Sequence, residues 1–164
     1  MFRYVKKLHF VGIGGIGMSG IAELLLNLGF KITGSDINDS AVIENLKNKG
    51  AEVTQGHAAK NVTDADVLVY SSAVQEDNPE VIAAQEKGVP AIRRAEMLGE
   101  LIALKETSIG VAGTHGKTST SSMIGTVLSQ AKLDPTLVVG GLVRNIDTNS
   151  LLGAGDIIVV EADE

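Results

Sequence analysis

The stretch from Gly110 to Thr120 constrains the fold of this chain more than any other part of the sequence. An apolar, β-branched run ends at Val111, and a segment with helical character begins near Lys117. A strand, a glycine-rich loop and a helix in this order are typical of a phosphate-binding loop. Glycines let the backbone turn tightly, so that several N–H groups and the positive end of the helix dipole face phosphate oxygens. The stretch therefore predicts an ATP or GTP site.

The residues of this loop have separate predicted roles. We expect Lys117 to contact the β- and γ-phosphates, and the Thr118 hydroxyl to ligate a Mg²⁺ that bridges them. The strict pattern starts with a glycine at the place where this chain has Val111, so an ordinary glycine turn before a helix is the alternative interpretation. The predicted ATP-binding residues are Gly113, Thr114, His115, Gly116, Lys117, Thr118 and Ser119.

A second glycine loop lies near the start of the chain. The apolar run at 8–13 predicts a buried parallel strand, and it leads into Gly12-Ile13-Gly14-Gly15-Ile16-Gly17, the G-x-G-x-x-G pattern of nucleotide-binding folds. A helical apolar face follows, and a second predicted strand at 31–35 ends at Asp36. A carboxylate there can accept a hydrogen bond from a ribose hydroxyl or a base N–H. A tightly packed βαβ turn that binds no ligand is the alternative.

The rest of the chain alternates between short apolar runs and helical patterns, which indicates an α/β fold. Further strands are predicted at 51–55, 66–70, 89–93, 107–111, 136–139 and 157–160. Helices are predicted at 40–49, 79–87, 94–105 and 117–131, with a polar loop at 144–150. We expect a Rossmann-like parallel-sheet domain at 1–105, followed at 106–164 by the beginning of a P-loop ATPase domain. Because that second domain has too few predicted strands to close a sheet, we expect the chain to be a fragment of a longer protein.

Polar side chains follow several of the predicted strands, at the edge where open α/β sheets bind ligands. These residues are His57, Ser71, Ser72, Arg93 and Arg94. For any single one of them, a serine that caps a turn or an arginine in a solvated ion pair is the simpler interpretation. Glu161 follows the last predicted strand, where a phosphate-loop fold has a second Mg²⁺ ligand, although a solvated acidic turn would have the same pattern.

Composition narrows the classes of function. Hydrophobic residues at 44% and charged residues at 21% indicate a globular chain. A net charge of −6 and an aromatic content of 3% argue against a nucleic acid partner, because such proteins need a basic face or stacking side chains. The absence of cysteine excludes a disulfide scaffold and a thiolate metal site. No apolar run reaches the length of a membrane span and no signal-type leader is present, so we expect a cytoplasmic protein without a membrane partner.

Several of these motifs, in this order, resemble the bacterial Mur ligases. The residues that carry the resemblance are Gly12–Gly20, Gly34–Asp36, Tyr70–Val74, Arg93–Leu98, Gly113–Thr118 and Glu161–Glu164. The resemblance covers the whole chain, and it implies a first domain followed by the opening part of the family's central ATPase domain. It implies that UDP-N-acetylmuramic acid takes a phosphoryl group from ATP on its lactyl carboxylate. The amine of L-alanine then displaces phosphate to form an amide.

The resemblance also implies roles for individual residues. The Gly12–Gly17 loop would hold the UDP diphosphate, and Asp36 with the Ser71-Ser72 turn would lie near the uridine. Lys117 would act on the ATP phosphates as a catalytic residue, and Thr118 with Glu161 would hold Mg²⁺. His115 would be a second catalytic residue that faces the reacting carboxylate. The amino-acid pocket would lie beyond the last residue, so this chain alone would not catalyse ligation.

Three other functions stay open at this point. The first is a nicotinamide-dependent oxidoreductase, because the first part of the chain satisfies the dinucleotide-binding pattern, although a second glycine loop with Gly116-Lys117-Thr118 is not expected in one. The second is a nucleotide-sensing module without catalytic activity. The third, within the same family, is a ligase that recycles murein tripeptides, although the Gly12–Gly20 stretch is more similar to the alanine-adding members.

Overall fold

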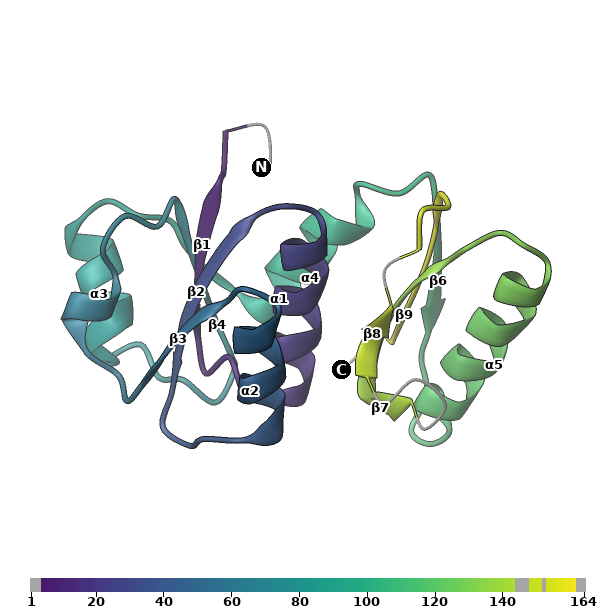
Figure 1. Ribbon diagram of the computed structural model, residues 1–164, viewed down its shortest axis with the longest axis horizontal. Helices are drawn as coiled ribbons and strands as arrows, with labels where there is room; N and C mark the ends of the chain where they lie inside the picture. Colours follow the sequence, from purple (N-terminus) through teal and green to yellow (C-terminus); the bar gives the residue numbers. More distant parts are fainter. Residues whose placement is uncertain (1–3, 144–147, 152, 162–164) are drawn as a thin grey trace. The chain divides into compact units, whose positions relative to one another are not determined.

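The computed structural model of the protein describes residues 4–143, 148–151 and 153–161. Two units, Met1–Leu98 and Gly99–Glu164, each contain their own sheet (Figure 1). The division between the units falls within helix α4 (Arg94–Ile102), a few residues before the domain boundary predicted between 105 and 106. The prediction that the two parts are a UDP-sugar domain and an ATP domain concerns their function, and it stays a prediction here.

The first unit is a doubly wound parallel sheet. Among the described residues its strand order is β3-β2-β1-β4-β5, and every neighbouring pair is parallel. The strands are β1 (Lys7–Val11), β2 (Lys31–Asp36), β3 (Glu52–Gln55), β4 (Val67–Tyr70) and β5 (Ala91–Arg93). Helices α1 (Ile16–Asn27) and α2 (Ala41–Asn48) lie on one face, and α3 (Pro79–Glu86) lies on the other (Figure 1). The predicted α/β, Rossmann-like parallel sheet is confirmed.

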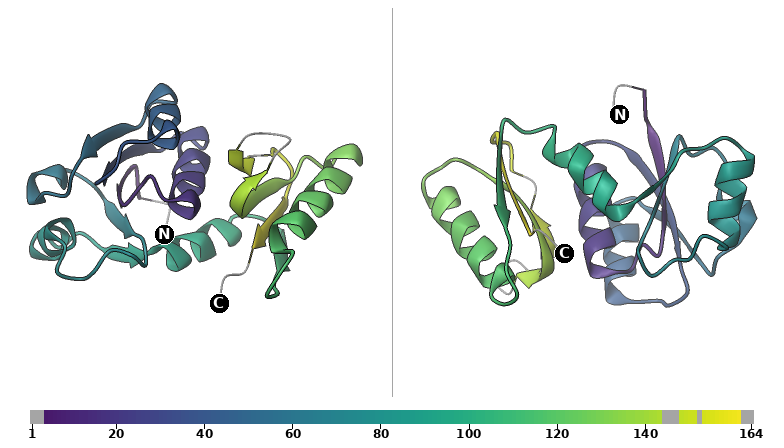
Figure 2. Two further views of the ribbon diagram at one scale, coloured as in Figure 1. Left: turned by 90° about the horizontal axis from the view of Figure 1, so that it is seen from below. Right: turned by 180° about the vertical axis from the view of Figure 1, so that it is seen from behind.

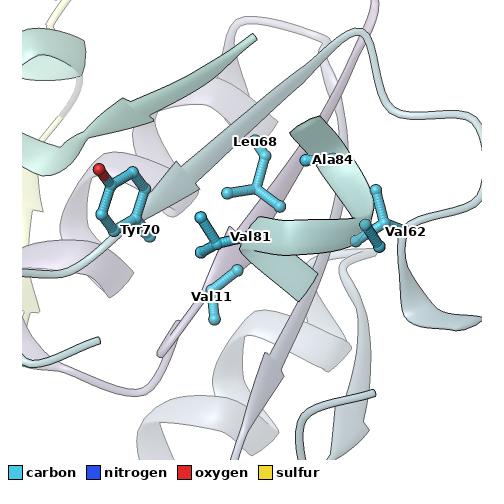
Figure 3. Close-up of a cluster of buried hydrophobic side chains, with 7 residues drawn as sticks. Val11, Val62, Leu68, Tyr70, Val81 and Ala84 are labelled. Carbon is cyan, nitrogen blue, oxygen red and sulfur yellow. The ribbon is translucent and has the colours of Figure 1, made fainter. Parts of the chain in front are cut away.

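The central strands are buried because helices cover both faces of this sheet. Strand β4 is buried at every residue, and β1 at every residue after Lys7. A sheet covered on both sides favours continuous apolar runs rather than alternation, and this is the pattern of β4 and, apart from Lys7 and the buried His9, of β1. Figure 3 shows one part of this core, where α3 packs against the sheet. The side chains there are Val11, Val62, Leu68, Tyr70, Val81, Ala83 and Ala84.

Side-chain caps set the starts of two helices. The Ser40 side chain accepts a hydrogen bond from the backbone N–H of Ile43, with an Oγ to N distance of 3.3 Å. Asn78 does the same for the N–H of Glu80 at 2.9 Å, and Pro79 occupies the first helical position, where an N–H is not needed. Helices α1 and α5 (Lys117–Gln130) instead begin after a glycine, which has no side-chain acceptor to offer. A phosphate can take that place at a helix N-terminus.

In the second unit, helix α5 packs against a mixed sheet. In the part of the chain that the structure describes, the strand order is β6-β9-β7-β8. The strands are β6 (Thr107–Val111), β7 (Thr136–Val143), β8 (Thr148–Leu151) and β9 (Ile157–Glu161). Helix α5 lies along one face of this sheet (Figure 2). A Cβ atom on Gly125 would clash with the side chain of Leu137, so this glycine lets the helix approach β7 closely.

The largest differences from the sequence-based predictions lie around β7. The strand predicted to end at 139 continues through Gly140 and Gly141 to Val143, and residues 148–150 of the predicted polar loop belong to β8. Strand β8 pairs antiparallel with β7, and this backbone pairing needs neither an apolar run nor alternation. Residues 144–147 of that loop lie outside the described residues.

Smaller differences concern element ends and a short helical turn. Helix α4 ends at Ile102 rather than 105, and β5 begins at Ala91 rather than 89. The 3₁₀ turn η1 (Ala59–Asn61) has no counterpart among the predicted elements. Within the described ranges, no helix combines the length and the apolar character needed to cross a membrane.

Candidate functional site

A cleft with a volume of about 450 Å³ opens at the carboxyl ends of the first sheet. The strand order turns back between β1 and β4, which is where doubly wound sheets bind ligands. Residues that follow the four strands β1 to β4 line the cleft. They are Gly12, Gly14, Gly15, Asp36, Ile37, Asn38, Ser40, His57, Ser71, Ala73 and Val74. Five of the predicted site residues, Gly12, Gly14, Gly15, Asp36 and Ser71, are therefore brought together at this edge.

Other predicted residues of this site lie beside the cleft rather than in its lining. Ile16 and Gly17 form the first turn of α1, and Ser72 is exposed. Gly17 lies against Arg94, because a Cβ atom built on this glycine would stand 2.9 Å from the Nη1 atom of Arg94. Arg93 instead lies over the ring of Tyr70, with its Cζ 5.2 Å from the ring centroid.

Close approach and backbone conformation explain the glycines of the first loop. Gly12 has a φ of +77°, and its N–H donates to the carbonyl of Ser35 at 2.8 Å. A Cβ atom on Gly14 would stand 2.9 Å from Oδ2 of Asp36. The loop therefore folds back onto the end of β2, and a side chain at either glycine would push it away.

Asp36 has a role that sequence reasoning did not foresee. Its Oδ2 accepts a hydrogen bond from the N–H of Gly14 at 2.8 Å, and its Oδ1 accepts one from the N–H of Asn38 at 3.0 Å. The carboxylate thus holds the glycine loop in place. Each carboxylate oxygen has more than one lone pair, so a further hydrogen bond from a ligand is compatible with this arrangement.

A buried carboxylate, that of Glu80 in α3, lies beside the lining of the cleft. The side chain is 0% exposed, and it accepts hydrogen bonds from the hydroxyl of Ser35 at 2.5 Å and the amide of Asn61 at 2.5 Å. The backbone N–H of Ala58 donates to it at 3.2 Å, and Nε2 of His9 lies 3.6 Å from Oε2. Burial alone would raise the pKa of Glu80, but the nearby imidazole of His9 and the hydrogen bonds from Ser35 and Asn61 outweigh it and lower the pKa to about 2. Glu80 is therefore ionised at neutral pH.

His57 connects this carboxylate to the cleft. It follows β3, lines the cleft, and has its Nδ1 atom 2.9 Å from Oγ of Ser35 and 3.4 Å from Oε2 of Glu80. His57 is one of the polar residues predicted at strand ends, but it is not among the predicted site residues. Its two inward contacts come from residues distant in the sequence, so no local pattern could have predicted them.

The glycine loop of the second unit, which is predicted to bind phosphate, is largely exposed in the described residues. Gly113 has a φ of +144° and Gly116 a φ of +78°, which are conformations that favour glycine. The ammonium group of Lys117 donates to the carbonyl of Gly113 at 2.8 Å, across the base of the loop. Thr114, His115 and Ser119 are exposed, and Thr118 is partly exposed.

Glu161 lies on the strand next to this loop. Strand β6 pairs with β9 so that Val111, the last residue before the loop, is opposite Glu161. Across 4–143, 148–151 and 153–161, no three His, Cys, Asp or Glu side chains gather as a metal site. Mg²⁺ in nucleotide sites takes one or two protein ligands and completes its shell with phosphate oxygens and water. A metal ion that arrives with a nucleotide would therefore need only one or two ligands from the chain, and the roles predicted for Thr118 and Glu161 stay predictions. Residues 162–164 lie outside the described residues.

Comparison with known protein families and sequences gives consistent results. A family model described as "Mur ligase family, catalytic domain" matches residues 7–106. The chain is 56% identical over 164 residues to the UDP-N-acetylmuramate–L-alanine ligase of Geobacter sp. (strain M21), covering 100% of this chain and 35% of that protein. It is 57% identical to the ligase of the same name from Herminiimonas arsenicoxydans, with the same coverage of 100% and 35%. The chain therefore spans about a third of the length of the curated relatives it matches.

Solved structures show the same similarity. The UDP-N-acetylmuramate-alanine ligase of Thermotoga maritima has a TM-score of 0.87 at 34% identity, over 94% of this chain and 37% of that one. The UDP-N-acetylmuramate:L-alanyl-gamma-D-glutamyl-meso-diaminopimelate ligase of Neisseria meningitidis has a TM-score of 0.88 at 31% identity, over 98% of this chain and 53% of that one.

Proposed function

The chain belongs to the Mur ligase family, and from this premise we propose that it supplies the UDP-sugar cleft and the ATP phosphate loop of an ATP-dependent ligase that joins L-alanine to UDP-N-acetylmuramic acid. The observation that carries the proposal is the 56% identity to a ligase of that name over the full chain, because the match runs through both glycine loops. In such a reaction the lactyl carboxylate receives a phosphoryl group from ATP, and the amine of L-alanine then displaces phosphate. Positioning and neutralisation of charge carry this chemistry.

The cleft of the first unit supports the UDP-sugar part of the proposal. Its glycine loop precedes the N-terminus of α1, and backbone N–H groups with a helix dipole bind a diphosphate without a cluster of basic side chains. This suits a chain with a net charge of −6. In the proposal the Gly12–Gly17 loop holds the diphosphate, and Asp36 and Ser71 lie beside the uridine.

The loop of the second unit supports the ATP part. Gly116 precedes α5 in a left-handed conformation, so that the first N–H groups of the helix follow directly after the loop. In the proposal Lys117 neutralises charge on the transferred phosphoryl group, Thr118 and Glu161 hold Mg²⁺, and His115 faces the reacting carboxylate. The Mg²⁺ ion would neutralise charge on the phosphates.

A ligase that recycles murein tripeptides is the second candidate. The Neisseria meningitidis enzyme matches the chain with a TM-score of 0.88, against 0.87 for the alanine-adding enzyme of Thermotoga maritima. Both enzymes carry UDP-N-acetylmuramate in their names, so the proposed cleft serves either function. The identity of 56% to an alanine-adding ligase favours the first candidate.

Calorimetric titration of the chain with UDP-N-acetylmuramic acid tests the proposal, with Mg-ATP and NADH titrated in parallel. We expect the UDP-sugar to bind and NADH not to bind. Asp36→Ala should weaken UDP-sugar binding, whereas Asp64→Asn should not, because Asp64 pairs with Lys7 at the opposite edge of the same sheet. Binding of NADH without the UDP-sugar would instead support an oxidoreductase. Binding of Mg-ATP alone would support a nucleotide-sensing module.

A further inference from the structure

The imidazole of His57 is oriented by its contacts with the buried network. Its side chain is 18% exposed, and it lines the cleft while Nδ1 points inward to Ser35 and Glu80. Because Nδ1 is engaged on the protein side, Nε2 is the ring nitrogen that remains for a molecule in the cleft.

The direction of the hydrogen bonds determines which nitrogen carries the proton. Glu80 is ionised, and an ionised carboxylate can only accept. The hydroxyl of Ser35 donates its single hydrogen to Oε2 of Glu80 at 2.5 Å, so the same oxygen accepts from His57. Nδ1 of His57 is therefore the protonated nitrogen. In the neutral imidazole, Nε2 then has a lone pair and acts as an acceptor.

The position of His57 in the cleft indicates which part of a nucleotide it meets. The glycine loop after β1 is the place for a diphosphate, and Asp36 after β2 is the place for a ribose. His57 follows β3, so it lies on the nucleoside side of the cleft. The side chain of Ile37, which is 64% exposed, lines the same cleft and offers an apolar surface to a base.

We propose that His57 is a specificity-determining residue whose Nε2 accepts a hydrogen bond from the uridine of the ligand, and that Glu80 is the positioning residue that holds this tautomer through Ser35. The inference rests on the UDP-sugar function proposed above. Uridine offers two kinds of donor, the N3–H of uracil and the ribose hydroxyls. Cytosine has a lone pair at N3 in place of the hydrogen, so an acceptor at Nε2 would disfavour a cytidine nucleotide that is bound through this position.

Two substitutions of His57 distinguish the role of Nδ1 from that of Nε2. Asn at this position keeps an N–H near Nδ1 and removes the group that faces the cleft, whereas Gln places an amide near Nε2. We expect His57→Asn to weaken binding of UDP to the chain about tenfold in calorimetry, and His57→Gln to recover part of the loss. Unchanged affinity in His57→Asn would overturn the inference.

Nucleotide analogues identify the donor. If uracil N3–H is the donor, wild-type chain should bind CDP and 3-methyl-UDP about tenfold more weakly than UDP, and His57→Asn should lose this preference. If a ribose hydroxyl is the donor, the preference and its loss should appear with 2′-deoxy-UDP or 3′-deoxy-UDP instead. The proposal would be contradicted if the relative affinities for all these nucleotides were the same in the wild-type chain and in His57→Asn.

The positioning role of Glu80 has a separate spectroscopic test. Glu80→Gln puts an amide donor where the carboxylate accepts, so we expect ¹⁵N NMR of His57 to show the proton moving from Nδ1 to Nε2, together with weaker binding of UDP. Glu86→Gln, an exposed substitution on the same helix, should change neither. Ser35→Ala tests the same link if Glu80→Gln does not fold. A wild-type spectrum with the proton on Nε2 would overturn the assignment.

The outcomes also separate this inference from the function on which it rests. A wild-type chain that binds neither UDP nor UDP-N-acetylmuramic acid would refute the proposed function and this inference together. If the wild-type chain binds both ligands and His57→Asn binds them with the same affinity and selectivity, only the role of His57 would be refuted.

Discussion

The two glycine loops share a local pattern but differ in their surroundings. The loop of the first unit follows β1, which is buried, and side chains after β2, β3 and β4 complete a cleft around it. The loop of the second unit follows β6, which is exposed at several positions and is an edge strand among the described residues. Both units therefore share the strand, glycine loop and helix that are typical of phosphate-binding sites. A cleft requires side chains from the neighbouring strands as well.

The glycines in the two loops and in the strands beside them show the same contrast. In the first unit, Gly14 and Gly34 are required by contact, because a Cβ atom on either would meet another atom at less than 3.0 Å. Around Gly110 and Gly116 of the second unit, no described atom lies within 4 Å of such a Cβ. Gly116 is required only by its left-handed φ of +78°.

The largest expected effect is a loss of stability of the first unit in acid. The folded pKa of Glu80 is about 2 against an ordinary value of 4.5, so the unfolded chain binds the proton more tightly. The contribution of Glu80, about 3 kcal/mol, is complete above pH 4.5 and is lost as the pH falls to about 2. All tyrosines and phenylalanines precede residue 99, so near-ultraviolet circular dichroism during urea unfolding reports on the first unit alone.

Glu80→Gln is the control for this acid effect. It should lower stability at neutral pH but flatten the dependence on pH between 4.5 and about 2. An equally steep dependence in this variant would assign the acid sensitivity to other groups. Far-ultraviolet dichroism, which follows helices of both units, would show whether the second unit unfolds at a different pH.

Matched glycine substitutions should have the next largest effect. A Cβ atom on Gly34 would stand 2.8 Å from the carbonyl oxygen of Phe10, which is a backbone atom of the neighbouring strand. We expect Gly34→Ala to lower the free energy of unfolding by about 2 kcal/mol. Gly110→Ala should change it by less than about 0.5 kcal/mol. If urea unfolding shows the same loss of free energy of unfolding for Gly34→Ala and Gly110→Ala, the two glycines do not differ in how closely they are packed.

Substitution of Lys117 tests whether the loops are separate sites. We expect Lys117→Ala to weaken binding of Mg-ATP at least tenfold, about 1.4 kcal/mol, because it removes the cation beside the α5 N-terminus. Binding of UDP-N-acetylmuramic acid should stay the same. Lys132→Gln, in the exposed turn after α5, is the control. If calorimetry shows that Lys117→Ala weakens binding of both the UDP-sugar and ATP, the two loops do not act as independent sites.

The smallest expected effect concerns the capped helices of the first unit. Asn78→Ala removes the acceptor for the N–H of Glu80 and should cost about 1 kcal/mol in urea unfolding. Asn48→Ala, at the exposed last residue of α2, removes the same amide without removing a cap and should have almost no effect. A similar loss in both variants would show that the cap is not responsible.

Most of the fold could be predicted because it follows from local signals. Strand β4 is a continuous apolar run, β1 is apolar except for Lys7 and His9, and Ser40 and Pro79 mark the starts of α2 and α3. Parallel strands joined by helices then leave few possible topologies. Strand β8 was missed because its residues, Thr-Asn-Ser-Leu, have no strand pattern of their own and depend on pairing with β7.

The candidate site could be predicted only in part. The glycine loops and Asp36 follow known spacings, and the structure places Gly12, Gly14, Gly15, Asp36 and Ser71 around one cleft. The contact of Asp36 with Gly14 and the network around Glu80 depend on tertiary packing. Ser35 and Glu80 are 45 residues apart in the sequence, and a glutamate in the first turn of a helix is ordinary on its own.

The network around Glu80 has a consequence for exchanging segments between this chain and its relatives. Ser35 of β2 and the residues Ala58 and Asn61 in and before η1 donate hydrogen bonds to Glu80 of α3, and His9 of β1 lies 3.6 Å from its carboxylate. A chimaera that inherits α3 from one parent and the end of β2 from a parent with different residues there would bury an uncompensated charge. Residues 7–11, 31–36, 57–61 and 78–86 should therefore be inherited as one block. Chimaeras whose parental segments are joined within this block would rarely fold, whereas chimaeras joined after residue 105 would keep the whole network.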